Sequence, residues 1–319
     1  MKLFVFIQHE EDRINSVSLE ALRGAQEIAE ESNGAVSAVT FSSSIEDQLT
    51  DYDLSEILVI DDQKLNTYNP LYYVKAMEDV ASAESPDVLV FGHSYEARDW
   101  VPLLSARLDI PFISDCINFK MNNQLTLTRS VYQGKFNSDT IVNHDQCIIS
   151  FQSGAFRADA LKMGSASIRN ISVELSAVND SIMPGEKFQE SETSVDLTQA
   201  DIIVSVGRGI GKEENLQIVR ELATTIGGKV ASSRPVVDSG WLEPYHQVGS
   251  SGQIVAPKLY LALGISGAIQ HVVGMKGSKN IVVINKDANA PLFEIADYGV
   301  VGDLFEIVPK LIAAIQDSK

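Results

Sequence analysis

A short apolar strand runs into a glycine loop at Ile202-Ile203-Val204-Ser205-Val206-Gly207-Arg208-Gly209-Ile210-Gly211. The same change from an apolar run to small, hydroxyl-bearing or polar residues recurs downstream. The further loops are Ser232-Ser233-Arg234-Pro235, Val248-Gly249-Ser250-Ser251-Gly252, Gly264-Ile265-Ser266-Gly267 and Asn285-Lys286-Asp287. Loops that follow parallel strands open at one edge of a sheet, so we expect all of these loops to line one long pocket. Such a pocket suits an extended, phosphate-bearing cofactor.

The first half of the chain alternates short apolar runs with amphipathic stretches. The runs are residues 2–7, 35–41, 56–60 and 87–91, and the amphipathic stretches between them include residues 18–32 and 70–83. This order predicts a parallel sheet flanked by helices. From residue 117 to about residue 176 apolar and polar residues alternate, which predicts antiparallel strands that close the first domain.

A polar, charged stretch at residues 179–199 contains Pro184-Gly185 and suits an exposed linker. The alternation resumes after it, with strands expected at residues 202–206, near Val230, at 259–263 and at 280–284, and helices at 213–226 and 304–315. We therefore predict two α/β domains, each a mainly parallel sheet flanked by helices. Their expected extents are residues 1–190 and 191–319.

Composition excludes several classes of protein. The chain has 25 basic and 43 acidic residues and a formal charge of -18, which works against binding nucleic acid or an anionic membrane surface. No apolar run is long enough for direct membrane insertion. The chain begins with a strand-like segment and no signal peptide, so we expect a cytoplasmic protein. Cys116 and Cys147 lack metal-ligand spacing and are expected to be buried thiols, with no metal site.

Two familiar nucleotide motifs do not fit the glycine loop. The dinucleotide fingerprint needs a third glycine at position 212, which is Lys212. A phosphate loop of nucleotide triphosphatases needs more residues between Gly207 and Gly211, and a Ser or Thr where Glu213 stands. What remains is a glycine turn at an expected helix start, which is still an anion site in principle.

The loops and their neighbours resemble, in order, the α (large) subunit of electron-transfer flavoproteins. The matching stretches are GRGIG (207–211), SRP (233–235), DSGW (238–241), QVGSSG (247–252), PKLY (257–260), GISGAIQH (264–271) and ADYG (296–299). A weaker resemblance covers residues 92–115 in the first domain. The resemblance implies a first domain with a nucleotide-hydrolase-like fold that pairs with a smaller β subunit, and a Rossmann-like C-terminal domain that binds one FAD.

The family's function is electron carriage from dehydrogenases, such as the acyl-CoA dehydrogenases of fatty acid β-oxidation, to a membrane quinone reductase. The resemblance places the cofactor-binding residues in the C-terminal loops. They are Arg208, Ser233, Arg234, Val248, Gly249, Ser250, Ser251, Ser266, Gly267, Ala268, Ile269, Gln270, His271, Asn285, Asp303 and Leu304. The family commonly has Gln at position 250, so Ser250 is a departure, whereas Ser251 keeps the hydroxyl that the family places near the flavin ring.

Charge near the flavin sets its reduction potential, because the reduced ring carries negative charge near N1 and O2. Arg234 and His271 are the candidate partners, and arginine is the better fixed charge. The alternatives are a solvated arginine and a structural histidine, on a helix that we expect Ser266 to cap. Arg208 is a candidate for the FAD diphosphate or adenosine. Asn285 and Asp303 either cap the next segment or contact ribose or adenine.

No nucleophile, metal cluster or acid–base carboxylate pair emerges from the sequence, which favours an electron carrier over an enzyme. Two other interpretations stay open. One is a flavin- or nicotinamide-dependent oxidoreductase with its own small-molecule substrate, and the other is a nucleotide-binding signalling protein. The sequence also leaves open which dehydrogenase donates, whether the complex bifurcates electrons, and whether the β subunit holds AMP or a second FAD.

Overall fold

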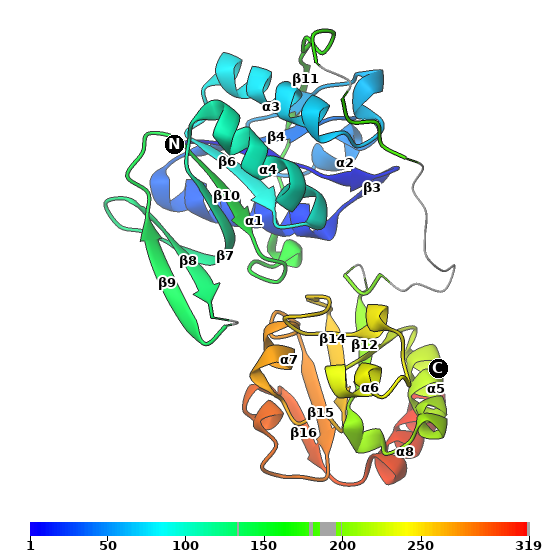
Figure 1. Ribbon diagram of the computed structural model, residues 1–319. Coiled ribbons are helices and arrows are strands. Elements are labelled where there is room, and N and C mark those ends of the chain that lie inside the picture. The colour runs from blue at the N-terminus through cyan, green and yellow to red at the C-terminus, as the bar shows by residue number, and fades with distance from the viewer. Residues whose placement is uncertain (133, 179–180, 186–195, 199, 318–319) are drawn as a thin grey trace. The chain divides into compact units, whose positions relative to one another are not determined.

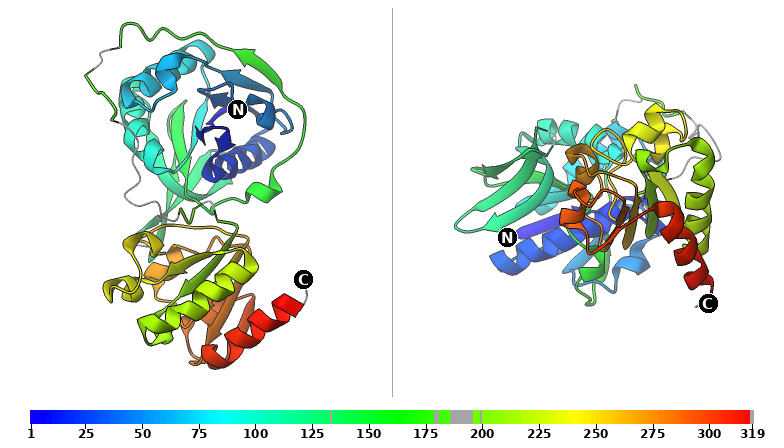
Figure 2. Two further views of the ribbon diagram at one scale, coloured as in Figure 1. Left: turned by 90° about the vertical axis from the view of Figure 1, so that its right-hand side faces the viewer. Right: turned by 90° about the horizontal axis from the view of Figure 1, so that it is seen from below.

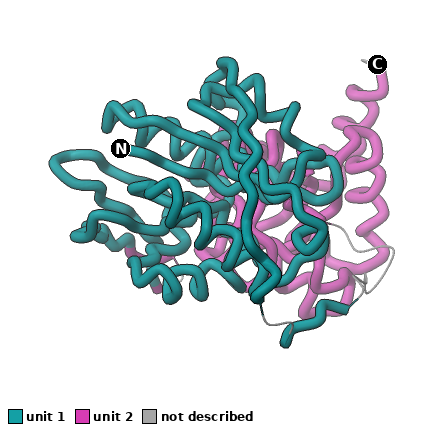
Figure 3. Tube along the Cα trace, turned by 90° about the horizontal axis from the view of Figure 1, so that it is seen from above, with its two compact units in different colours: residues 1–131, 137–188 teal, residues 132–136, 189–319 magenta. Residues whose placement is uncertain are grey.

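The computed structural model describes residues 1–132, 134–178, 181–185, 196–198 and 200–317. They form two compact units, one of residues 1–131 and 137–188 and the other of residues 132–136 and 189–319 (Figure 3). Each unit has its own sheet and helices, so the predicted class of two α/β domains is confirmed. The expected boundary between residues 190 and 191, and much of the expected linker at 179–199, lie outside the described residues.

The described residues of the first unit form a mainly parallel sheet with the strand order β11-β5-β4-β1-β6-β10-β7-β8-β9, and a separate hairpin, β2-β3. The strands are β1 (Lys2–Phe6), β2 (His9–Glu10), β3 (Arg13–Ile14), β4 (Ala35–Thr40), β5 (Glu56–Val59), β6 (Val88–Gly92), β7 (Phe112–Met121), β8 (Leu125–Val131), β9 (Phe136–Ile141), β10 (Cys147–Phe151) and β11 (Ser167–Asn170). The helices are α1 (Ser16–Ser32), α2 (Glu46–Leu49), α3 (Pro70–Glu84) and α4 (Tyr95–Leu108).

Alternate residues of the central strands build two cores, one on each face of this sheet. Leu3 and Val5 of β1 pack toward α1, whereas Phe4 and Phe6 pack toward α3 and α4 (Figure 1). Helix α3 begins as its sequence predicts, with the Asn69 side chain accepting a hydrogen bond from the backbone N–H two residues later, at 3.0 Å. Both faces of the sheet are therefore covered, as a parallel sheet requires.

The expectation of antiparallel strands between residues 117 and 176 is correct for β7 and β8 but wrong for β10 and β11. Strand β10 lies between β6 and β7 and is parallel to both, and β11 is parallel to β5. All five residues of β10 are buried, and a continuous apolar run is typical of a central strand of a parallel sheet. The central position of β10 is therefore explained by the burial of its residues, and not by an alternation of apolar and polar residues.

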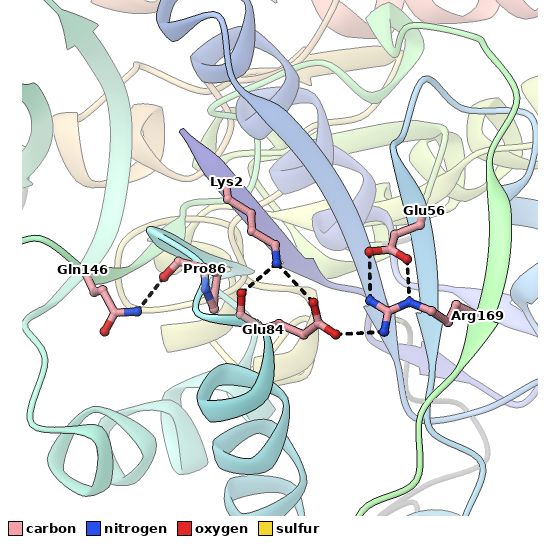
Figure 4. A network of polar contacts seen from close by, with 6 residues as sticks. All are labelled: Lys2, Glu56, Glu84, Pro86, Gln146 and Arg169. Carbon is pink, nitrogen blue, oxygen red and sulfur yellow. Dashed lines mark hydrogen bonds and ion pairs between the residues drawn. The ribbon is translucent and has the colours of Figure 1, made fainter.

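Strand β11 is exposed throughout and is held by ion pairs (Figure 4). The Arg169 guanidinium donates from Nε and Nη2 to the Glu56 carboxylate at 2.6 and 2.9 Å, and from Nη1 to Glu84 at 2.8 Å. Glu84 also accepts from Lys2 Nζ at 3.1 Å. These partly exposed pairs are weak individually. As a network they join β11 to the amino ends of β1 and β5, opposite the edge at which functional loops of such sheets lie.

The second unit has a parallel sheet with the strand order β13-β12-β14-β15-β16. Its strands are β12 (Ile202–Val206), β13 (Lys229–Ser232), β14 (Leu259–Leu263), β15 (Ile281–Asn285) and β16 (Tyr298–Val301), and its helices are α5 (Leu216–Ile226), α6 (Arg234–Asp238), α7 (Ile269–Val273) and α8 (Leu304–Asp317). The expected helix at 213–226 begins at Leu216, because residues 213–215 form a 3₁₀ turn. The direction of strand addition reverses between β12 and β14, so the loops after these strands lie at the switch point where such sheets bind ligands.

The two faces of the second sheet are covered differently. Helices α5 and α8 lie side by side on one face and complete an apolar core there (Figure 2). The other face is covered by short α7 and by loops that carry Val248, Ile265 and Leu292. The loop-covered face therefore brings irregular backbone next to the ends of β12 and β14.

One buried carboxyl group links α1 to the loop after β10. Glu20 is 7% exposed, and its Oε2 accepts a hydrogen bond from the Gly154 N–H at 2.7 Å. Burial raises the pKa of Glu20 to about 7. The raised pKa means that the folded state favours the protonated carboxyl group.

We expect Glu20→Gln to stabilise the first unit at alkaline pH. A group whose pKa is raised from 4.5 to about 7 on folding contributes stability that is complete below the lower value and is lost as pH rises through the upper one. Near pH 8 the variant should exceed the parent by about 1–3 kcal/mol, and it should gain nothing near pH 5. The free energy of unfolding is measured by urea titration, with Trp100 fluorescence as the signal in a Trp241→Phe background.

The matched control is Glu31→Gln, because Glu31 lies on the same helix but is exposed. Its unfolding free energy should follow that of the parent at both pH values. Equal stability of Glu20→Gln and the parent near pH 8 would contradict the assignment.

Candidate functional site

A cavity of about 670 Å³ lies in the second unit, where the loops leave the carboxyl ends of the strands. The loops after β12, β13, β14 and β15 and the Val248 loop all contribute to its lining. This volume lies within the range of about 300–1,000 Å³ that is usual for cofactor and small-molecule sites.

Most residues that the sequence predicted for the site line this cavity. They are Arg208, Ser233, Arg234, Val248, Gly249, Ser250, Ser251, Ser266, Ala268, Gln270, His271 and Asn285. The lining also contains residues absent from that prediction, namely Gly209, Pro235, Asp238, Gln247, Gly264, Ile265 and Asp287. All but Asp238 and Gln247 belong to the loops quoted from the sequence, and Asp238 stands one helical turn after Arg234.

Four predicted residues do not line the cavity. Leu304 is buried in the core under α8, and Ile269 is half exposed on α7. Asp303 caps α8, since its Oδ1 accepts from the Phe305 N–H at 2.8 Å. Gly267 has a φ of 92° and turns the chain before α7. Capping, one of the two alternatives for Asp303, is the role seen here.

Close glycine contact builds the floor of the cavity between β12 and β14. A Cβ atom at Gly207 would lie 2.3 Å from the Gly264 carbonyl oxygen, and one at Gly209 would lie 2.7 Å from the Gly264 Cα atom. Gly264 itself has a φ of 62°. The two loops approach so closely that no side chain fits between them. The expected anion site at a helix start is wrong in one respect, because the turn continues as a 3₁₀ turn, Arg208–Ile210, and does not lead directly into α5.

Arg234 supplies an exposed positive charge in the cavity wall. Its Nε lies 3.3 Å from Asp238 Oδ2, and the two side chains are 68% and 60% exposed. An ion pair so open to solvent contributes little stability. The guanidinium can therefore turn from Asp238 to a ligand at small cost.

The Val248 loop is attached to α7 and presents a hydroxyl group. The Ser250 N–H donates to the Gln270 carbonyl oxygen at 2.7 Å. Ser251 Oγ accepts from Gln247 Nε2 at 2.9 Å, so its own hydrogen is not used in this bond and can be donated to a ligand. Although Ser250 lacks the amide that the family commonly has there, two glutamines, Gln247 and Gln270, belong to the same lining.

His271 is 5% exposed, and both of its ring nitrogens have protein partners. Nδ1 lies 3.0 Å from the Val248 carbonyl oxygen, and Nε2 lies 3.1 Å from the Tyr260 hydroxyl oxygen. Burial lowers the pKa of His271 to about 4, so the ring is neutral at pH 7. Of the two residues considered as charge partners of the flavin, Arg234 and not His271 therefore carries a fixed positive charge. The expected helix start at Ser266 is wrong, because α7 begins only after the Gly267 turn.

Asn285 uses its amide to shape its own loop. Nδ2 donates to the Ile265 carbonyl oxygen at 2.9 Å, and Oδ1 accepts from the Asp287 N–H at 3.0 Å. These contacts agree with the capping role that the sequence left open. Asn285 still lines the cavity and keeps two loops at a fixed spacing.

A second polar cluster, in the first unit, superficially resembles a catalytic triad. His93 Nδ1 lies 2.9 Å from Ser150 Oγ, and His93 Nε2 lies 3.8 Å from Asp115 Oδ1. Ser150 is fully buried and already accepts from the Asp115 N–H at 3.1 Å. A buried serine cannot meet a substrate, and 3.8 Å is too long for a hydrogen bond. The cluster is structural and does not support the interpretation as an enzyme.

Within the described ranges, no group of His, Cys, Asp or Glu side chains could hold a metal ion. In the same part of the chain, every helix is too short or too polar to span a bilayer. Cys116 and Cys147 are both buried thiols, as predicted.

Comparison with known proteins covers both units. Residues 3–176 match the electron transfer flavoprotein domain, and residues 196–276 match the electron transfer flavoprotein FAD-binding domain. The electron transfer flavoprotein subunit alpha of Bacillus subtilis is 36% identical over 97% of this chain and 96% of its own length. That of Thermoanaerobacterium thermosaccharolyticum is 35% identical, with 99% and 98% covered. The acryloyl-CoA reductase electron transfer subunit beta of Anaerotignum propionicum is 32% identical, with 99% and 96% covered. The chain therefore belongs to the electron transfer flavoprotein alpha-subunit family, whose second domain has FAD as its cofactor.

Proposed function

We propose that this chain holds FAD in the cavity of its second unit and, as the large subunit of a heterodimer, carries electrons between partner proteins. The observation that supports this most is the cavity itself, which the loops after β12, β13, β14 and β15 and the Val248 loop line together. It lies at the switch point, in the unit that matches the FAD-binding domain.

The lining residues fit the chemistry of FAD. Gly209 and Gly264 keep the cavity floor free of side chains, and Arg208 adds a positive charge to the lining that suits a diphosphate. Ser251 offers a hydroxyl hydrogen to the polar edge of a ring, and Arg234 offers a fixed charge. When bound, FAD supplies reversible transfer of one or two electrons. The protein's part is to hold, orient and electrostatically bias the cofactor.

Electron carriage is favoured over conversion of a small substrate. The one triad-like cluster found in the described residues has a buried serine and is structural. The relatives named above are electron transfer subunits. A flavin-dependent oxidoreductase with its own substrate would instead show turnover in the absence of any partner protein.

The partners that we propose follow the family. The first unit pairs with a smaller β subunit, dehydrogenases such as acyl-CoA dehydrogenases donate electrons, and a quinone reductase or another acceptor receives them. The name of the Anaerotignum propionicum relative connects that protein with a reductase of a CoA thioester, which supports an acyl-CoA enzyme as the partner. We place the complex in the cytoplasm.

The first test of this function is flavin content. The chain co-purified with its β subunit should release FAD on denaturation, and Ser266→Trp should reduce the amount because Ser266 lines the cavity. Thr224→Trp is the matched control, since Thr224 is exposed on α5 away from the cavity lining. FMN in place of FAD, no flavin, or full occupancy in Ser266→Trp would contradict the placement.

The second test concerns the charge at Arg234. A fixed cation near the ring favours its negatively charged reduced form, so Arg234→Ala should lower the flavin potential by on the order of 20–60 mV, equivalent to about 1–3 kcal/mol for a two-electron couple. Arg234→Lys should recover part of the loss, since lysine keeps the charge but not the planar head. Asp238→Asn should raise the potential, because it removes the opposing charge.

Spectroelectrochemical titration of the FAD-loaded heterodimers measures these shifts. Lys258→Ala is the matched control, because Lys258 belongs to another exposed ion pair of the same unit, with Asp201 at 3.0 Å, and does not line the cavity. A potential for Arg234→Ala equal to or above that of the parent would show that Arg234 does not face the flavin.

A further inference from the structure

Tyr260 and His271 form a buried side-chain pair at the cavity wall: His271 belongs to the lining, and Tyr260 lies behind it. Tyr260 is the second residue of β14 and is 0% exposed, and its hydroxyl oxygen lies 3.1 Å from His271 Nε2. The two rings lie 6.1 Å apart between centroids, at an angle of 60°. They do not stack, so the hydroxyl group is the closest link between them.

The hydrogen-bond partners leave one consistent arrangement of protons. A backbone carbonyl oxygen only accepts, so the Val248 contact at 3.0 Å requires the hydrogen on His271 Nδ1. A neutral imidazole carries one hydrogen, so Nε2 has a lone pair and accepts from the Tyr260 hydroxyl group. The three groups form a chain in which Tyr260 donates to His271 and His271 donates to Val248. Each bond is buried, where an unmade hydrogen bond is costly.

The end of this chain is the loop that carries the cavity's hydroxyl groups. Val248 is followed by Gly249, Ser250 and Ser251, which line the cavity. A Cβ atom at Gly249 would lie 2.8 Å from the Gln270 carbonyl oxygen, so the loop lies directly against α7. The loop is bonded to α7 on both sides of Gly249. On one side the Val248 carbonyl oxygen accepts from His271 Nδ1, and on the other the Ser250 N–H donates to the Gln270 carbonyl oxygen.

We propose that Tyr260 is a positioning residue of the flavin site: by donating to His271 Nε2 it fixes the Nδ1–H tautomer, and through it the Val248 carbonyl oxygen and the Gly249–Ser251 wall. The proposal rests on the proposed function, because it takes this cavity as the flavin site. It assigns His271 a different part from the ring contact expected from the family resemblance. The histidine transmits the position of Tyr260 to the loop, and Ser251 makes the contact with the ligand.

The test compares Tyr260→Phe with the parent in the heterodimer with the β subunit, labelled with ¹⁵N in histidine. The ring nitrogen signals of His271, assigned by their loss in His271→Ala, report its tautomer. Hydrogen exchange of the Ser250 amide reports the loop, and titration of the flavin-depleted complex with FAD gives the dissociation constant. The control is Tyr298→Phe, which also removes a phenolic hydroxyl but from a side chain that is 67% exposed on β16.

The parent and the control should show the Nδ1–H tautomer at pH 7. Tyr260→Phe should show a mixture of tautomers or a protonated ring, faster exchange at Ser250, and an FAD dissociation constant raised about fivefold, as expected for one lost hydrogen bond. In a His271→Ala background, where Tyr260 is no longer connected to Val248, Tyr260→Phe should change that constant less than twofold.

Several results would overturn the proposal. They are an Nε2–H or doubly protonated His271 in the parent, an unchanged tautomer and exchange rate in Tyr260→Phe, or a full additional loss of affinity in the His271→Ala background. The parent measurement does not need Tyr260→Phe, so it decides the matter even if that variant fails to fold. If the parent binds no FAD, the proposed function fails, whereas the tautomer and exchange results still decide whether Tyr260 positions the loop.

Discussion

The close contact between the ends of β12 and β14 determines where every other part of the site lies. Gly207 and Gly209 meet Gly264 at distances that exclude any side chain. Because these strands flank the reversal in strand order, their loops would otherwise diverge and leave a crevice. The glycines instead close the crevice at its base and leave its upper part open. The remaining loops then stand around this floor as walls.

The net negative charge of the protein is unfavourable for binding an anionic cofactor. The chain carries a formal charge of -18, and a diphosphate-bearing cofactor is itself an anion, so the field of the whole protein opposes binding. The lining contains the cations Arg208 and Arg234, yet Arg234 is paired with Asp238. Attraction must therefore come at short range, from Arg208 and from side-chain hydroxyls and amides, which act where the distant charges are screened. This agrees with a lining that contains four serines, Ser233, Ser250, Ser251 and Ser266, and no lysine.

Local chemistry made the loops predictable, whereas pairings between distant segments did not show in the sequence. The strands β12, β13 and β14 run directly into glycine or serine, so the shared edge of their loops could be inferred from order alone. The insertion of β10 between β6 and β7 depends on contacts between segments far apart in sequence. Asp238 was within reach of prediction, because it stands four residues after Arg234. The partnership of Tyr260 with His271 was not, because it depends on how α7 folds back over β14 after the Gly267 turn.

Both units are built on a mainly parallel sheet, but they differ in what occupies the carboxyl edge of that sheet. In the first unit the carboxyl edge of β6 and β10 is occupied by its own side chains: His93 contacts Ser150 at 2.9 Å, and Gln152 donates to Asp115 at 3.1 Å. Asp115 adopts a φ of 59° to complete this cluster. In the second unit the equivalent edge carries glycines and short side chains, and there the space remains open. This one edge is thus closed by the protein's own side chains in the first unit and left with room for a cofactor in the second.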